Sequence, residues 1–181
     1  MNQPKVSIIY HGTAGALQVL AQDVAAGAEE EGAVVRVRRV PEPAVPGAGE
    51  FGGLATADDA SWTDAVVLGS PTRYGNVTSQ LKSYVETLAS LRGEGLRETV
   101  WSGFAPDDGV LHGGREATLM ALFHTLSRLG GVLVSAPRVQ DLSAGREVRM
   151  LARQTGRDVT RVARRLRVGA AAEGGQEPGS R

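Results

Sequence analysis

The segment from Ala65 to Leu88 constrains the fold more than any other part of the chain. It opens with a short apolar run, Ala65–Leu68, which is typical of a strand buried on both faces of a parallel sheet. A loop rich in Gly, Pro and Asn follows, and apolar residues then recur at helical spacing from Val77 to Leu88. In an open α/β sheet, a loop between a strand and a helix lies at the carboxyl edge, where ligands bind.

The same alternation of strand and helix patterns repeats along the chain and predicts an α/β fold with a parallel sheet covered by helices on both faces. The second apolar run alternates Val with Arg, which favours an edge strand with one solvated face. Pro41–Ala60 is predicted to be a surface loop. Its Gly47-x-Gly49-x-x-Gly52 is not a dinucleotide fingerprint, since no strand precedes it. The five predicted strands are Val6–Tyr10, Val34–Val40, Ala65–Leu68, Thr99–Phe104 and Val132–Ala136.

Length and composition indicate one domain. The 181 residues suit a single core over residues 1–168, and the Gly-, Ala-, Glu- and Pro-rich stretch 169–181 is predicted to be a disordered tail. The chain contains no cysteine, which excludes disulfides, thiol catalysis and iron–sulfur clusters. No apolar run is long enough to span a membrane and no signal peptide is evident, so we expect a cytoplasmic protein without membrane contacts.

The charge balance narrows the classes of partner. The chain carries 20 basic and 20 acidic residues, so its formal net charge is zero. This gives no electrostatic footprint for nucleic acid and favours an enzyme acting on small molecules. A row of arginines on the last helix would suit an NADPH 2′-phosphate, an acidic partner or RNA, but zero net charge favours a solvated face. The row comprises Arg146, Arg149, Arg153, Arg157, Arg161 and Arg164.

Two loops have the composition of ligand sites. The turn Gly12–Ala16 joins the first strand to a helix N-terminus, where free N–H groups favour an anion; without a Lys after Gly15 it is not a nucleotide-triphosphate P-loop. The loop Pro71–Asn76 combines backbone donors with polar side chains and one aromatic ring. An ordinary strand–helix loop that binds no ligand can have a similar composition. Asp107 and Asp108 suit local capping of a turn better than a metal or acid–base pair, so we predict no metal site.

The second loop carries a family resemblance. Gly69-Ser70-Pro71-Thr72-Arg73-Tyr74-Gly75-Asn76, followed by Gln80-Leu81-Lys82, closely resembles the flavin loop G-[ST]-P-T-R-[FY]-G-N-x-x-x-Q-[ML] of the tryptophan-repressor-binding-protein-like NAD(P)H:quinone oxidoreductases. Gly113–Thr118 is similar to that family's G-G-Q-E-x-T. The resemblance implies a flavodoxin-like, doubly wound, five-stranded parallel sheet of order 2-1-3-4-5, with FMN at the carboxyl ends of strands 1, 3 and 4.

The resemblance also implies an activity and a set of residues. NADH or NADPH would reduce FMN, and the flavin would then reduce a quinone or related acceptor by two electrons. We expect a homo-oligomer, a dimer or a tetramer. Arg73 and His112 are the candidate catalytic residues. The implied cofactor-binding residues are Gly12, Thr13, Ala14, Gly15, Ala16, Pro71, Thr72, Arg73, Tyr74, Gly75, Asn76, Ser102, Gly103, Phe104, Gly113 and Gly114.

Several departures from the family pattern leave alternatives open. The first loop keeps only Thr13 among the family's hydroxyl and aromatic side chains, and Arg128 and Leu129 replace a His that faces the flavin. The family's Trp near the quinone and its cover segment after the fifth strand are missing. An accessory or binding protein with lost or weakened flavin binding is therefore an alternative. So is an electron-carrier flavodoxin, which would need an acidic face. Inserted residues at Ala105–Leu111 would suit a cover for a bulkier acceptor.

Overall fold

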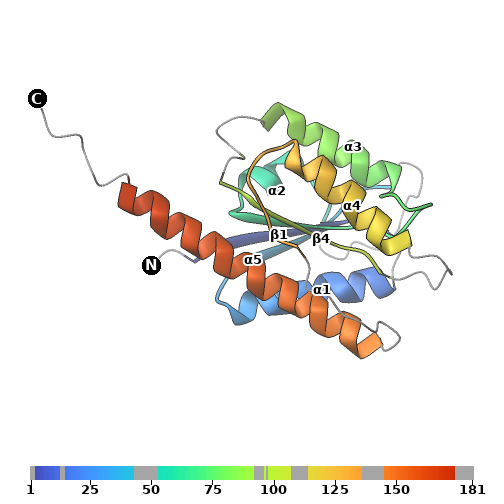
Figure 1. Ribbon diagram of the computed structural model, residues 1–181, viewed down its shortest axis with the longest axis horizontal. Helices are drawn as coiled ribbons and strands as arrows, with labels where there is room; N and C mark the ends of the chain where they lie inside the picture. Colours follow the sequence, from blue (N-terminus) through green and yellow to red (C-terminus); the bar gives the residue numbers. More distant parts are fainter. Residues whose placement is uncertain are drawn as a thin grey trace, which may run out of the picture.

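Five parallel strands form one sheet in the order β2-β1-β3-β4-β5, as predicted (Figure 1). The computed structural model describes residues 3–12, 15–42, 53–91, 96, 98–106, 114–135 and 145–173. The order is that of a doubly wound flavodoxin-like sheet and places β1 and β3 side by side at the switch point. The strands are β1 (Lys5–Tyr10), β2 (Val34–Arg39), β3 (Ala65–Gly69), β4 (Val100–Phe104) and β5 (Val132–Leu133).

Helices cover both faces of the sheet. Figure 1 shows α3 and α4 on one face and α1 and α5 on the other. A short 3₁₀ turn, Leu88–Leu91, follows α3. No helix in the described part of the chain is long and apolar enough to cross a bilayer. The helices are α1 (Ala16–Glu30), α2 (Ala57–Ser61), α3 (Ser79–Thr87), α4 (Gly114–Ser127) and α5 (Gly145–Glu173).

Alternate residues of the strands divide the core into two layers. In β3, Ala65 and Val67 pack with α1 and α5, whereas Val66 and Leu68 pack with α3 and α4. All four side chains are fully buried. Successive side chains of a strand point to opposite faces, so a continuous apolar run supplies both layers.

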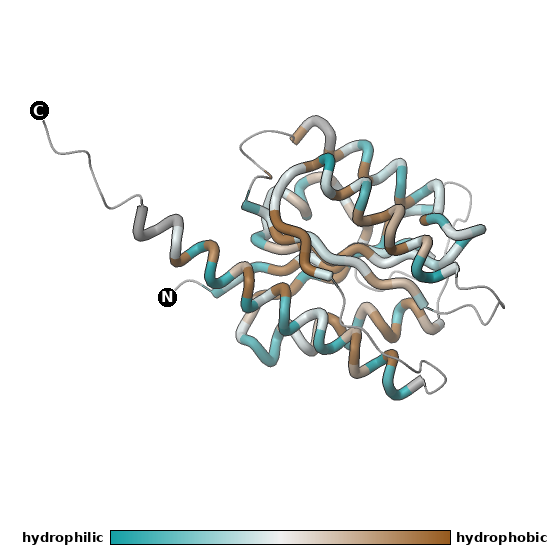
Figure 2. The backbone as a smooth tube through the Cα atoms, in the orientation of Figure 1, coloured by the Kyte–Doolittle hydropathy of each residue, from teal (hydrophilic) through white to brown (hydrophobic). Residues whose placement is uncertain are grey.

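Helices α1 and α5 approach each other at two glycines. A Cβ atom on Gly27 would collide with the backbone of Arg153, and one on Gly156 would collide with the backbone of Val24. Around this crossing, Ala28 and Val159 are fully buried. The tube of α5 alternates between hydrophilic and hydrophobic residues along its length (Figure 2), as expected for a helix that buries one stripe.

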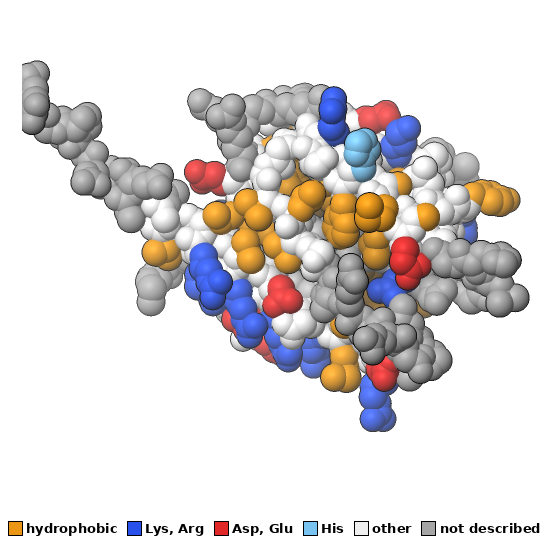
Figure 3. Space-filling model, viewed as in Figure 1, with side chains coloured by type: hydrophobic (Ala, Val, Ile, Leu, Met, Phe, Trp, Pro, Cys, Tyr) orange, Lys and Arg blue, Asp and Glu red, His pale blue; other side chains and the backbone are white. Residues whose placement is uncertain are grey.

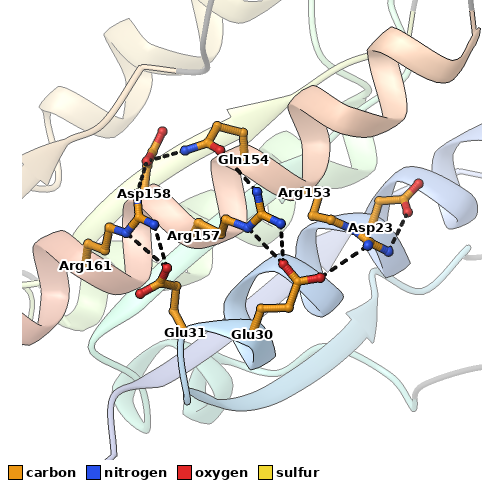
Figure 4. Close-up of polar contacts among 8 residues, drawn as sticks. All are labelled: Asp23, Glu30, Glu31, Arg153, Gln154, Arg157, Asp158 and Arg161. Carbon is orange, nitrogen blue, oxygen red and sulfur yellow. Dashed lines mark hydrogen bonds and ion pairs between the residues drawn. The ribbon is translucent and has the colours of Figure 1, made fainter.

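The arginine row of α5 lies on a solvated face, as predicted, and also forms ion pairs with acidic residues of α1; the side chains of Arg149 and Arg161 are 58% and 48% exposed. Figure 3 shows basic side chains in a row along α5 with acidic ones among them. Arg149 Nε lies 2.7 Å from Asp23 Oδ2, and Arg161 Nη2 lies 2.7 Å from Glu31 Oε1. Glu30 and its partners lie between these two pairs (Figure 4). Five arginines of the row are therefore paired with carboxylates: Arg149, Arg153, Arg157, Arg161 and Arg164.

Three predicted boundaries differ from the structure. Within the segment predicted to be a loop, α2 forms because Thr56 and Asp59 make a capping box. Strand β5 ends at Leu133, before the predicted end at Ala136, which lies outside the described residues. Helix α5 continues through Gly169 to Glu173, into the predicted tail. The glycines of 47–52 and Asp107–Asp108 also lie outside the described residues.

Candidate functional site

The loop after β3 forms a tight two-residue turn. Arg73 N donates to Asn76 O at 2.9 Å, and Asn76 N donates to Arg73 O at 3.0 Å. The two central residues, Tyr74 and Gly75, have φ angles of 53° and 74°. Positive φ at both positions is typical of a type I′ turn. Glycine adopts positive φ readily, whereas other residues adopt it at an energetic cost. The turn holds the Tyr74 side chain fully exposed, at 107% relative accessibility.

The base of this loop is closed by Ser70. Its Oγ accepts a hydrogen bond from Thr78 N at 3.0 Å and donates to Pro71 O at 2.9 Å. Thr78 then caps α3 by accepting from Leu81 N at 3.4 Å. Both side chains are buried. Because buried polar groups fix the path of the chain on each side of the turn, the loop is a preformed structure.

The start of α4 packs directly on the loop. A Cβ on Gly114 would lie 2.8 Å from Thr72 Cγ2, and a Cβ on Gly75 would lie 3.2 Å from Ala117 Cβ. Thr118 Oγ1 reaches Asn76 O at 3.4 Å. The structure therefore brings together the two segments that carried the family resemblance.

The turn after β1 has little side-chain chemistry in its described part. Gly15, with φ of 132°, precedes α1 and brings no capping side chain, so among the described residues no side chain caps the first N–H groups of the helix, which can face an anion. Gly12 lies against Leu17, which a Cβ would meet at 2.8 Å. Thr13 and Ala14 lie outside the described residues.

One cavity of about 510 Å³ joins the two loops. Gly12 and Ala16 line it from the first loop, and Pro71 and Arg73 line it from the second. Arg73 is exposed, and its Nη1 lies 3.4 Å from Thr72 O. The other described lining residues are His11, Leu17, Glu42, Val77, Thr78, Ser79, Gln80 and Pro106.

A cluster of three polar side chains in this cavity was missed by the sequence analysis. His11 Nε2 lies 2.8 Å from Glu42 Oε2, and Gln80 Nε2 donates to Glu42 Oε1 at 3.3 Å. His11 directly follows β1, which is the position of a site residue in this type of sheet. No comparable signal marks Glu42, because it follows β2 in a Pro-rich stretch without periodicity.

A second cavity, of about 610 Å³, lies between α3 and the segment that leads into α2. It shares Ser79 and Gln80 with the first cavity, so the first turn of α3 lines both. Tyr84 lines its wall and donates from its hydroxyl to Thr56 O at 3.0 Å. Burial, with a smaller contribution from Asp59, raises the pKa of Tyr84 above its usual range. Tyr84 therefore joins α3 to α2 as a neutral donor.

The other residues predicted to bind the cofactor or to act in catalysis lie at several different places in the fold. Ser102 and Gly103 lie inside β4 and are buried, where Gly103 leaves room for Leu122. Phe104 packs against Gly69 at the end of the same strand pair. His112 and Gly113 lie outside the described residues, so their roles stay predictions. Of the described residues, no three potential metal ligands come together.

The described residues fit a flavin with a polar side chain. The two glycine-containing loops enclose one cavity, and Gly114 lets the start of α4 approach Thr72 beside it. Thr72 Oγ1 is buried in the second loop and has no hydrogen-bond partner in the described part of the chain. Backbone N–H groups, Arg73, Ser79 and Gln80 supply donors at the cavity. Such a site suits a flat ring with polar edges that carries a hydroxylated chain.

Comparison with known proteins agrees with this geometry. No protein-family model matches the chain. An NAD(P)H dehydrogenase (quinone) of Cupriavidus metallidurans is 36% identical over 141 residues, which are 74% of this chain and 71% of the relative. The chain belongs to the NAD(P)H dehydrogenase (quinone) family. A second member, from Rhodopseudomonas palustris, is 33% identical over 72% of this chain and 69% of its own length.

The fold of this family member is also found among solved structures. The crystal structure of a WrbA-like flavodoxin protein from Agrobacterium tumefaciens superposes with a TM-score of 0.69 at 22% identity, over 90% of this chain and 99% of that chain. An archaeal flavodoxin gives a TM-score of 0.60 at 14% identity, over 88% of this chain and 99% of that chain. The family and the fold predicted from the sequence are thus confirmed.

Proposed function

We propose that the chain is an FMN-dependent NAD(P)H:quinone oxidoreductase. The observation that carries this proposal is the preformed loop Gly69–Thr78, packed on the start of α4 and opening into a cavity shared with the first loop. Membership of the NAD(P)H dehydrogenase (quinone) family supports the same donor and the same class of acceptor. The predicted class of enzyme agrees with that membership.

The proposed roles follow from the position of each residue. Thr72, Gly75 and Gly114 would hold the ring, and the N–H groups at Gly15 and Ala16 would face the far end of the ligand. The bound flavin would accept a hydride from NAD(P)H and deliver two electrons to the quinone. Arg73 adds a positive charge at the cavity, which would stabilise negative charge that develops on the ligand.

Oligomeric state and location remain proposals. Val132 and Leu133 of β5 are 37% and 40% exposed at the open edge of the sheet, and Met120 of α4 is 70% exposed. Exposed apolar side chains at a sheet edge support the predicted homo-oligomer. Light scattering of the purified chain would give the number of subunits. A cytoplasmic location stays a prediction from the sequence.

Visible absorption of the purified chain tests the function. We expect added FMN to bind, NADH or NADPH to bleach the flavin band without oxygen, and a benzoquinone to restore it. Protein that ignores excess FMN would contradict the oxidoreductase and leave the accessory-protein alternative. Flavin that binds but exchanges electrons only with a protein partner would instead indicate an electron carrier.

A further inference from the structure

We infer that Glu42 determines which end group the flavin site accepts: it disfavours a terminal phosphate and favours terminal hydroxyl groups. The inference rests on the proposed function, because it concerns the same cavity. The ligand class that follows is a flavin whose side chain ends in hydroxyls, such as riboflavin, bound nearly as well as FMN.

Glu42 reaches the site from outside both flavin loops. It follows β2, and its carboxylate contacts His11 at the end of β1 and Gln80 in the first turn of α3. The side chain of Glu42 is 36% exposed, whereas that of His11 is 7% exposed. Glu42 lines the same cavity as Gly12 and Ala16 of the first loop. A carboxylate is therefore built into the wall where a phosphate would approach α1.

The contact with His11 is a hydrogen bond that holds this carboxylate in the cavity wall. A carboxylate only accepts hydrogen bonds, so His11 Nε2 must carry the hydrogen of the 2.8 Å contact. The other ring nitrogen, Nδ1, is buried without a partner in the described part of the chain. That environment suits a lone pair better than a second N–H, which would be left unsatisfied. The ring therefore donates through Nε2, and Glu42 is the one acidic residue among the described residues that line the cavity.

The cavity offers little to offset the charge of this carboxylate. Besides His11, Arg73 is the single basic side chain among its described lining residues, and Arg73 belongs to the other loop. The described part of the first loop offers backbone N–H groups from Gly12, Gly15 and Ala16 but no side-chain donor. A phosphate dianion in this cavity would meet repulsion from Glu42. A ribityl hydroxyl would find in the same carboxylate a strong acceptor.

The test compares two ligands that differ only in the phosphate. Dissociation constants for FMN and riboflavin are measured by quenching of flavin fluorescence, for the unmodified chain and for Glu42→Gln. We expect FMN to bind at most about tenfold more tightly than riboflavin to the unmodified chain, and Glu42→Gln to tighten FMN by about tenfold while riboflavin changes less than about twofold. Added salt should shrink the effect on FMN.

Two further variants make the comparison specific. Glu86→Gln removes an equal charge from the exposed side of α3, outside the cavity lining, and should leave both affinities unchanged. Ser79→Asp adds a carboxylate to the same cavity wall at a helix N-terminus, where Asp is well tolerated. It should weaken FMN and spare riboflavin. An unchanged FMN-to-riboflavin ratio in Ser79→Asp would overturn the inference even if Glu42→Gln fails to fold, because it would mean that no phosphate approaches this wall.

Each outcome separates the inference from the proposed function. If the ratio of the FMN and riboflavin dissociation constants does not change in Glu42→Gln and Ser79→Asp, the role of Glu42 is overturned. FMN binding by the unmodified chain would still support the oxidoreductase. Weaker FMN binding in Glu42→Gln would also overturn it and would assign Glu42 to phosphate binding through His11. An unmodified chain that binds neither flavin would overturn both.

Discussion

The two faces of the sheet are built on different principles. On one face, α1 and α5 cross at glycines and are joined by ion pairs along their length. On the other, α3 and α4 are linked through a polar loop, and α3 lines two cavities. At the crossing of α1 and α5 the first face is packed to the limit that backbone atoms allow, whereas the second face has a cavity of about 610 Å³ beside α3. The closest packing therefore lies along α1 and α5, whereas the cavities lie at the start of α3, where the first of them also meets the N-terminus of α1.

The glycine crossing should give the largest effect on stability. Gly156→Ala places a methyl group on the backbone of Val24, which cannot move without parting α1 from α5. We expect the free energy of unfolding to fall by at least about 3 kcal/mol in a urea titration. Gly169→Ala is the matched control in the same helix, because no atom lies within 4 Å of its Cβ position. It should gain about 0.5 to 1 kcal/mol from helix propensity. Equal effects would refute the close crossing.

Asp23 should give the next largest effect. It is 5% exposed and accepts from both Arg149 Nε and Nη2, at 2.7 and 3.2 Å. Asp23→Asn weakens two charge-assisted hydrogen bonds to a buried carboxylate but leaves Arg149 solvated, at 58% exposure, so we expect a loss of about 1 kcal/mol in the same titration. Glu29→Gln changes an exposed residue of the same helix and should stay within about 0.5 kcal/mol of the unmodified chain. A similar loss in both variants would indicate a general effect of charge.

The opposite face should respond in binding more than in stability. Gly75→Ala forces a methyl group into a left-handed turn and towards Ala117, at 3.2 Å, so we expect FMN affinity to fall by about tenfold. Gly32→Ala imposes the same backbone cost at a φ of 77° in the turn after α1, where nothing lies within 4 Å. It should lower stability by about 1 kcal/mol and leave FMN affinity unchanged. Isothermal titration and thermal melting would separate the two effects.

The smallest expected effect is the pH dependence of one ion pair. A hydrogen bond from Arg161 lowers the pKa of Glu31 below its ordinary value of 4.5. A lowered folded-state pKa adds stability that is present above about pH 4.5 and is lost as pH falls through the folded value. Glu31→Gln should therefore lower the free energy of unfolding by about 0.5 kcal/mol at pH 7. At a pH below the folded-state pKa of Glu31, the substitution should have no effect on it. Urea titrations at several pH values would show it; a difference that persists in acid would exclude the ion pair as its cause.

The fold could be predicted because its signals are local. Apolar runs such as Ala65–Leu68 need to be buried on both faces, and only a covered parallel sheet provides that. The site loop could be predicted from its motif, because the type I′ turn and the Ser70 closure use residues within one short segment. The capping box from Thr56 to Asp59 was equally local and could have identified α2.

What could not be predicted depends on pairs far apart in the sequence. The periodicity of the arginines placed them on one face of α5 but did not show that Asp23 and Glu31 would lie opposite. Glu42 reaches the cavity only because the order of the strands places β2 beside β1. Neither partner carries a signal in its own neighbourhood, since contacts between distant segments follow from topology.

The length of α5 has a consequence for local dynamics. Its 29 residues begin beside α1, and its C-terminal turns extend beyond the body of the molecule. Near Gly156 the helix is clamped between neighbours, whereas Val168 is 64% exposed. Amide hydrogens should therefore exchange with solvent slowly near Gly156 and progressively faster towards Glu173. Exchange near Gly156 would require global unfolding of the protein, whereas exchange near Glu173 would require only fraying of the helix end.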